Sequence, residues 1–127
     1  MQVELVSPER ILFSGEASTV ILRAAGGDIA FLDNHAPFLG AVDIGVVRII
    51  RDGEPDELAA VHGGFVEVRD NRVIILSDVA ELASQIDVER ARASKAQAEE
   101  QLRTEQDAEN EAALRRAVVR LEVANAA

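Results

Sequence analysis

The sequence has 127 residues, of which 48% are apolar, and it contains no cysteine, tryptophan or tyrosine. This length suits one domain with an appendage, and the apolar residues suffice for a core built mainly of aliphatic side chains. The absence of cysteine excludes disulfide bonds, thiolate metal ligands and cysteine nucleophiles. The formal charge of −10 leaves no basic surface for a phosphate backbone, so nucleic acid is not expected as a ligand.

The first nine residues have no basic segment and include Glu4, so they are not expected to be a signal peptide. No charge-free apolar stretch approaches the roughly 18 residues that a membrane-spanning helix needs. We therefore expect an intracellular, soluble protein that is not itself inserted in a membrane.

The first two thirds of the chain predict short strands separated by turns. Gly26-Gly27 and Asp33 to Pro37 are typical of a turn and a loop, because paired glycines adopt positive φ easily and proline cannot donate to a strand ladder. His62-Gly63-Gly64 is predicted as a further turn. Short β-branched runs at this spacing favour an antiparallel β sandwich or barrel over residues 1–84. The expected strands cover residues 2–6, 10–13, 19–22, 29–32, 46–51, 58–61, 65–68 and 73–76.

Residues 85–127 are rich in Ala, Glu, Gln and Arg, which favour helix, and Asp87 is placed to cap its start. Apolar residues recur at helical spacing, and many of them are alanines, whose burial stabilises a helix less than that of leucines. One uninterrupted helix from Asp87 to Asn125 would span about 58 Å at about 1.5 Å per residue. The tail therefore either folds back or projects from the domain, and residues 106–110 form the weakest stretch.

Two interpretations of this tail remain open. It is a permanent antiparallel hairpin, or it is a conformational switch in which the weak stretch changes between turn and helix. The predicted fold class is α+β in either case, with an N-terminal antiparallel β sandwich followed by a two-helix hairpin that the switch would extend.

Several strings resemble the epsilon subunit of the bacterial F-type ATP synthase. Residues 27–39, GDIAFLDNHAPFL, are similar to that family's GELGILPGHAPLL segment, and residues 63–68, GGFVEV, are similar to its GGFLEV segment. Residues 86–91, IDVERA, match its IDxxRA motif, and residues 113–121 are similar to its second helix. These matches occur in the order of the family and cover nearly the whole chain.

The resemblance implies a non-catalytic rotor subunit that joins the gamma subunit to the c-ring of a proton-translocating ATP synthase. It implies a peripheral position at the cytoplasmic face of the cell membrane. It also implies that the tail extends along gamma, transiently contacts the alpha and beta subunits, and inhibits ATP hydrolysis. No cofactor is required, although in some members the folded hairpin binds ATP as a regulatory ligand.

The loop at Asp33, Asn34 and His35 is the predicted c-ring contact, because this loop faces the c-ring in the family. The family usually has Pro-Gly where this chain has Asp33-Asn34. Asparagine tolerates the left-handed conformation, so we expect the turn to be kept. Phe31 replaces a residue that is usually aliphatic, which suits a core position.

A nucleotide site on the tail is the second candidate. Helical spacing places Asp87 and Arg90 on one face of the first helix, and Arg116 and Arg120 on one face of the second. Guanidinium groups near a helix N-terminus suit phosphate. The family motif places its nucleotide contacts at Glu81, Ile86, Asp87, Arg90, Ala91, Arg116 and Arg120. The alternative is that Asp87 only caps the helix and the arginines form solvated pairs, each contributing roughly 0–1 kcal/mol.

Two other classes of protein compete with this interpretation: a free-standing nucleotide sensor and a small β-barrel metal protein. The only histidines, His35 and His62, are too few for a metal site, which usually has three or four ligands. No serine, Ser77 included, has the context of a nucleophile.

Overall fold

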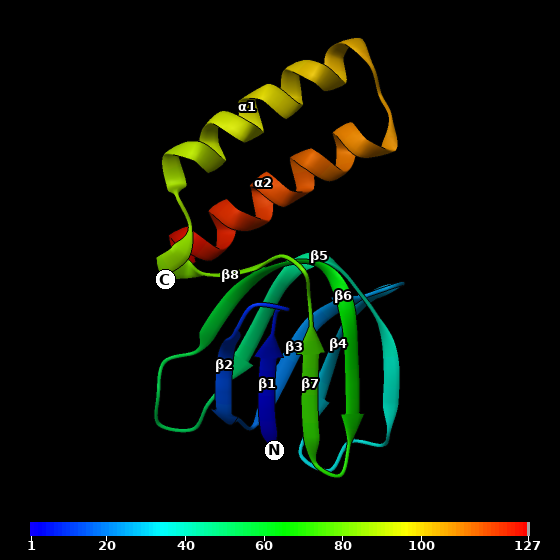
Figure 1. The fold of residues 1–127 in the computed structure, drawn as a ribbon, viewed down its shortest axis with the longest axis vertical. Coiled ribbons are helices and arrows are strands. Elements are labelled where there is room, and N and C mark those ends of the chain that lie inside the picture. The colour runs from blue at the N-terminus through cyan, green and yellow to red at the C-terminus, as the bar shows by residue number, and fades with distance from the viewer. Residues whose placement is uncertain (127) are drawn as a thin grey trace.

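The computed structural model describes residues 1–126, in which a helical hairpin stands on one end of a β sandwich (Figure 1). The predicted fold class is confirmed. The strands are β1 (Gln2–Val6), β2 (Ile11–Glu16), β3 (Thr19–Ala24), β4 (Gly27–Leu32), β5 (Phe38–Ile50), β6 (Glu57–Arg69), β7 (Arg72–Leu76) and β8 (Ala80–Leu82). A single 3-10 turn, η1 (Ala83–Gln85), leads to helices α1 (Val88–Thr104) and α2 (Ala108–Ala126).

The strands form one continuous ladder in the order β2-β1-β7-β6-β5-β3-β4, with β8 paired to β6. The pairing is antiparallel except between β1 and β7. Strands β5 and β6 have 13 residues each and pair along almost their whole lengths. Residues 59–61 of β6 pair with β8, and residues 65–69 pair with β7, so this strand joins the region below the helices to the far end of the sandwich.

The prediction of a turn at His62-Gly63-Gly64 is wrong, because β6 runs through these residues without a break. Both glycines have positive φ, +93° and +131°, as a turn would require. The ladder with β5 nevertheless continues on both sides of them, so the glycines bend the strand and do not end it. A Cβ atom at Gly64 would overlap the carbonyl oxygen of Leu76, which explains why glycine stands there.

Other boundaries also differ from those predicted. Strand β5 begins at Phe38, eight residues before the predicted start at Val46, and β2 continues through Ser14 and Gly15 to Glu16. Strand β8 was not predicted, because its three residues carry no alternation that distinguishes them from a loop.

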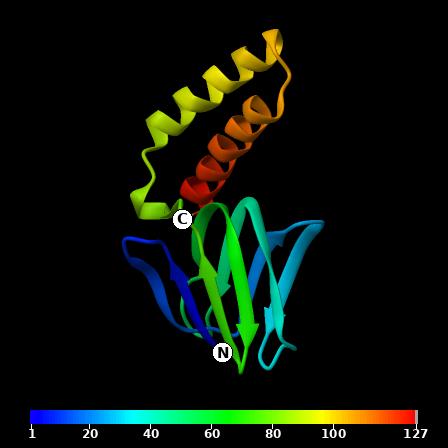
Figure 2. The ribbon, with the colours of Figure 1, turned by 45° about the vertical axis from the view of Figure 1, so that its right-hand side comes forward.

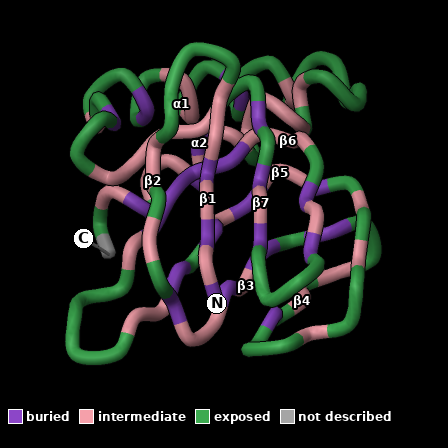
Figure 3. Tube along the Cα trace, turned by 60° about the horizontal axis from the view of Figure 1, so that its bottom comes forward, coloured by how far each residue is buried: buried purple, intermediate pink, exposed green. Residues whose placement is uncertain are grey.

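The core lies between the layers of the sandwich and follows the alternation of the strands (Figure 3). Val3, Leu5, Val20 and Ile75 are fully buried, and Phe31 fills the same core at 0% exposure. Full burial of such a side chain contributes roughly 1.5–3 kcal/mol, so this aliphatic core holds the sandwich together without disulfides.

The hairpin packs on the sandwich mainly through α2, which contacts β5 and β6, whereas α1 packs on α2 (Figure 2). Ala91 and Ala98 of α1 and Ala117 of α2 are buried. A second, smaller core lies where the hairpin meets the sandwich, and its buried residues are Leu58, Ala60, Ile86, Val119 and Val123. The hairpin is therefore held by a limited apolar contact.

Each helix begins at an aspartate that caps it. Oδ1 of Asp87 accepts from the backbone N–H of Arg90 at 3.1 Å, and Oδ1 of Asp107 accepts from that of Asn110 at 2.8 Å. The chain leaves helix geometry at residues 105–107, which overlap the first two residues of the predicted weak stretch. The hairpin in this structure is folded back, and its extension stays a prediction.

Candidate functional site

The residues predicted for the tail site gather where α1 begins, β8 ends and α2 passes. Glu81, Asp87, Arg90, Ala91 and Arg120 line one pocket of about 260 Å³, together with Gln85 and Ser94. Asp87 and Arg90 stand on the first turn of α1, where free backbone N–H groups and the helix dipole favour an anion. Five of the seven predicted residues thus line one pocket.

The other two predicted residues lie elsewhere. Ile86 is 9% exposed and belongs to the small core between hairpin and sandwich. Arg116 donates to Oε1 of Glu109 at 2.7 Å and does not line the pocket. Arg120, one turn further along α2, is the residue of that helix whose guanidinium lines the pocket.

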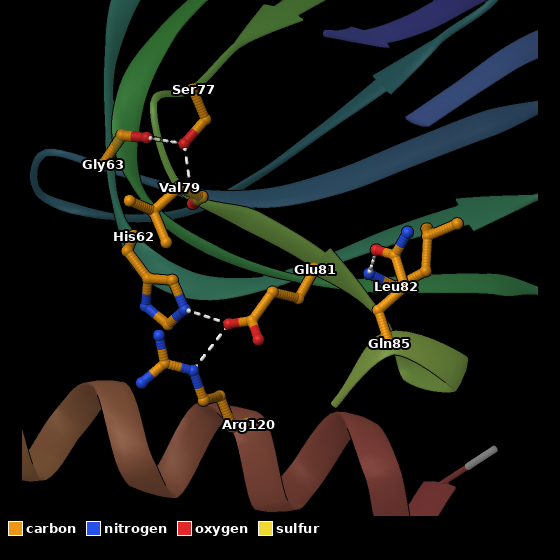
Figure 4. A network of polar contacts seen from close by, with 8 residues as sticks. All are labelled: His62, Gly63, Ser77, Val79, Glu81, Leu82, Gln85 and Arg120. Carbon is orange, nitrogen blue, oxygen red and sulfur yellow. Dashed lines mark hydrogen bonds and ion pairs between the residues drawn. The ribbon is translucent and has the colours of Figure 1, made fainter. Parts of the chain in front are cut away.

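A polar network beside the pocket connects three elements (Figure 4). Oε1 of Glu81, on β8, accepts from Nε of Arg120 at 2.6 Å and lies 3.3 Å from Nε2 of His62, on β6. The side chain of His62 is 2% exposed, and those of Glu81 and Arg120 are each 27% exposed. One carboxylate oxygen therefore joins both strands to α2.

The surroundings of His62 disfavour its charged form. Burial lowers the pKa of His62 below its ordinary value, and the guanidinium of Arg120 lowers it further. The hydrogen bond to Glu81 raises the same pKa but does not outweigh burial. Sequence reasoning missed this role of His62, because nothing in the chain order shows that α2 covers the middle of β6.

Ser77 supports this arrangement from the turn before β8. Its side chain is buried, and its Oγ lies 2.6 Å from the carbonyl oxygen of Gly63 and 3.0 Å from that of Val79 (Figure 4). The hydroxyl thus fixes the bend of β6 against the segment that leads to β8 and Glu81.

The predicted c-ring loop lies between β4 and β5, at the end of the sandwich where the N-terminus lies and opposite the hairpin (Figure 1). Asn34 has φ of +61°, as expected, and its backbone N–H donates to Oδ1 of Asn71. Oδ1 of Asp33 accepts from the amino group of Met1 at 2.6 Å. The His35 ring packs edge-on against Phe31, with 5.0 Å between ring centroids. The loop is exposed but held in one conformation by these contacts.

No helix in residues 1–126 is both long and apolar enough to cross a membrane.

Two family models together match almost the whole chain. Residues 1–83 match the β-sandwich domain of the ATP synthase delta/epsilon chain, and residues 84–125 match its long α-helix domain. The chain belongs to the ATP synthase delta/epsilon family. The predicted resemblance is confirmed.

Curated relatives of the family agree. The ATP synthase epsilon chain of Brevibacillus brevis is 46% identical over 109 residues, which are 86% of this chain and 82% of the relative. That of Bacillus velezensis is 43% identical and covers 98% of this chain and 96% of its own length. The prediction that the chain is an epsilon-type subunit of an ATP synthase is confirmed.

Solved structures share the fold at lower identity. A chain in the mitochondrial ATP synthase of Euglena gracilis, determined as OSCP/F1/c-ring, has a TM-score of 0.81 at 21% identity and covers 97% of this chain and 79% of its own. A chain from the central stalk and c-ring of the Tetrahymena thermophila enzyme has a TM-score of 0.57 at 16% identity, covering 98% and 93%. These two chains therefore share the fold of this chain although most of their residues differ from it.

Proposed function

We propose that this chain is a non-catalytic subunit of the rotor that joins gamma to the c-ring at the cytoplasmic face of the membrane. Its helical hairpin, residues 88–126, regulates ATP hydrolysis. Folded back, the hairpin binds ATP; extended, it contacts the alpha and beta subunits and inhibits. Both structural neighbours come from assemblies that contain the c-ring, with F1 in Euglena and with the central stalk in Tetrahymena, and family membership supports carrying these partners to this chain.

The observation that carries the nucleotide part is the pocket at the start of α1. Arg90 and Arg120 line it beside the N-terminus of a 17-residue helix, and both features favour phosphate. Asp87 and Glu81 supply acceptors for the amino and hydroxyl groups of a nucleoside. The volume of about 260 Å³ is just below the roughly 300–1,000 Å³ of typical small-molecule pockets. We therefore expect the Arg120 side chain, which now pairs with Glu81, to turn toward the ligand when ATP binds.

The attachment of the hairpin supports the regulatory part. The apolar contact between α2 and the sandwich is small, and the buried residues of α1 are two alanines, Ala91 and Ala98, which bury little area. Residues 105–107 contain neither glycine nor proline, so nothing in them prevents a continuous helix. Both properties lower the cost of extension.

The loop of Asp33, Asn34 and His35 is our candidate for contact with the c-ring. It is exposed, it is fixed by Asn71 and Phe31, and it lies at the end of the sandwich opposite the hairpin. A partner on this loop would leave the hairpin free to move.

A cysteine at Asn34 should form a disulfide with a cysteine on the c-ring loop, whereas one at Asp56, which is exposed in another turn, should not.

Removal of residues 85–127 tests the regulatory function. The truncated chain should still assemble with gamma and the c-ring, and the ATPase activity of the reconstituted complex should rise. Equal activity with the full and the truncated chain would contradict regulation by the hairpin. Failure of the full chain to bind gamma would instead favour a free-standing sensor.

Titration with ATP tests the ligand. The amide resonances of residues 81–94 and of Arg120 should shift with ATP and not with inorganic phosphate at equal ionic strength. If millimolar ATP shifts none of them, the nucleotide part of the proposal is lost, while the truncation experiment still decides the regulatory part.

A further inference from the structure

His62 is the sandwich residue that shares a partner with α2. Its Nε2 lies 3.3 Å from Oε1 of Glu81, and the same oxygen accepts from Nε of Arg120 at 2.6 Å. The imidazole is almost completely enclosed, with 2% of the side chain exposed. Figure 4 shows the ring facing both the carboxylate and the guanidinium, between β6 and α2. Any change in the charge of this ring therefore acts at the junction of sandwich and hairpin.

The hydrogen bonding identifies the form of the ring that fits. An ionised carboxylate only accepts, so Nε2 must carry the proton that is donated to Glu81. The other nitrogen, Nδ1, is buried and has no partner among the described residues. In the neutral ring it is an unprotonated acceptor. A second proton would have to sit on Nδ1, where it would be a buried charged donor with no acceptor.

The charged groups around His62 make that second proton still less favourable. Two of them, the guanidinium groups of Arg120 and Arg116 on α2, are positive. Glu81 on β8 is the negative group, and its Oε1 already accepts from Arg120. On β5, Ile44 lies opposite His62, and the carboxylate of the adjoining Asp43 pairs with Arg115 at 3.7 Å. Asp78, in the turn between β7 and β8, lines a cavity that His62 also lines.

We propose that His62 is a proton-sensitive contact that stabilises the docked hairpin while its ring is neutral and promotes release of the hairpin when the ring takes up a second proton.

The direction follows from what release removes. When α2 leaves, Arg120 and Arg116 leave with it and water reaches the ring, whereas Glu81 stays on β8. The pKa of His62, which burial and Arg120 lower in the docked form, then rises toward its ordinary value. The released form therefore binds a proton that the docked form does not. Docking of the hairpin is therefore unaffected by pH well above the ordinary histidine pKa of about 6.5, and it weakens as the pH falls below that value.

Measurement of the hairpin position against pH tests the proposal. The chain has no cysteine, so Glu9→Cys and Glu99→Cys, both exposed, would carry a unique pair of spin labels on the β1–β2 turn and on α1. As the pH is lowered from 8 to 5.5, the ratio of docked to released chains should fall. Ordinary carboxyl groups, with pKa values near about 4, stay ionised over this range. One proton limits this fall to about tenfold per pH unit.

The two histidines of the chain provide a matched pair of variants. His62→Gln keeps an amide that can donate to Glu81 but cannot titrate, so its docked fraction should not change over this pH range. His35→Gln, in the loop at the opposite end, should keep the response of the unchanged chain. A flat response in the unchanged chain, or equal slopes for it and His62→Gln, would overturn the proposal.

A second measurement decides the matter if His62→Gln fails to fold. Imidazole resonances of the unsubstituted chain report the protonation of each histidine separately. His62 should titrate together with the change in label distance and below the ordinary histidine pKa of about 6.5. Protonation of His62 in a hairpin that stays docked would refute the proposal. Neither measurement needs nucleotide or the assembled enzyme, so failure here leaves the proposed function standing.

Discussion

Nε of Arg120 donates to Oε1 of Glu81 at 2.6 Å, and this bond links the second helix of the hairpin to the last strand of the sandwich. Arg120→Ala removes it. We expect the amides of α2 to lose about 1 kcal/mol of protection against hydrogen exchange, the scale for a partly exposed charge pair. Amides of β1 and β7 should keep theirs, because the sandwich core does not depend on the hairpin.

A double-mutant cycle with Glu81→Gln separates the interaction energy of Arg120 and Glu81 from the other consequences of changing either residue. Arg120→Ala and Glu81→Gln together should cost less than the sum of the two separate changes. Arg115→Ala is the matched control, because Arg115 lies in α2 but is 53% exposed and pairs with Asp43 at 3.7 Å. Strict additivity of Arg120→Ala and Glu81→Gln would show that their contact contributes nothing.

The nucleotide pocket predicts different consequences for two neighbouring arginines of α1. Both are exposed, but Arg90 lines the pocket, whereas Arg92 pairs with Glu89 at 2.7 Å. Arg90→Ala should weaken ATP binding by at least about tenfold, because a charge-assisted bond to phosphate contributes roughly 1.5–3 kcal/mol. Arg92→Ala should change it by less than about twofold. Calorimetric titration of both variants checks this, and equal losses would count against the pocket.

The hairpin turn depends on Asp107, whose carboxylate caps α2 through the N–H of Asn110. Asp107→Ala removes the cap, at a cost of about 1 kcal/mol to the turn, and introduces the best helix former. We expect a larger share of extended hairpins, measured as longer distances between labels on α1 and α2. Glu105→Ala is the control, because it introduces the same helix former in the same turn while the C-cap bond of Glu105 to Gln101, made by its backbone N–H, is kept. A shorter or unchanged distance in Asp107→Ala would contradict a turn that can become helix.

The bend in β6 predicts unequal costs for two glycines with positive φ. At Gly64, φ is +131° and an added Cβ would overlap the carbonyl oxygen of Leu76. At Gly26, φ is +99° and no atom lies within 4 Å of an added Cβ. Gly26→Ala should cost about 1–2 kcal/mol of unfolding free energy, from backbone strain alone. Gly64→Ala should cost at least about 3 kcal/mol, since backbone atoms must also move. Urea unfolding measures both, and equal costs would contradict the close approach of Leu76.

Sequence reasoning succeeded where the signal is local. The cap at Asp87 and the left-handed Asn34 each depend on one residue and its immediate neighbours, and the structure has both. The predicted turn at Gly63 and Gly64 was wrong although its local signal was correct. Both glycines have positive φ, but pairing with β5 continues the strand through them. Whether a bend ends a strand is decided by its partner, which the local sequence does not contain.

The tail pocket shows the same limit. Helical spacing places Asp87, Arg90 and Ala91 together, and folding the tail back brings Arg120 to them. Arg116 instead meets Glu109 on its own helix, a choice between side-chain partners that spacing cannot make. The contact of His62 with Glu81 could not be predicted from the sequence, since it depends on strand β8, which has no recognisable pattern.

The ends of the sandwich are connected by β5 and β6, two long strands paired almost throughout, and not by a linker. A hydrogen-bonded ladder stretches very little, whereas a flexible linker of equal length absorbs a load by changing its end-to-end distance. Torque applied at the loop end should therefore reach the helical end without slack. In a rotating shaft, such a body would transmit motion as a stiff coupling, and the hairpin, held by a small apolar contact, is the part that we expect to lag.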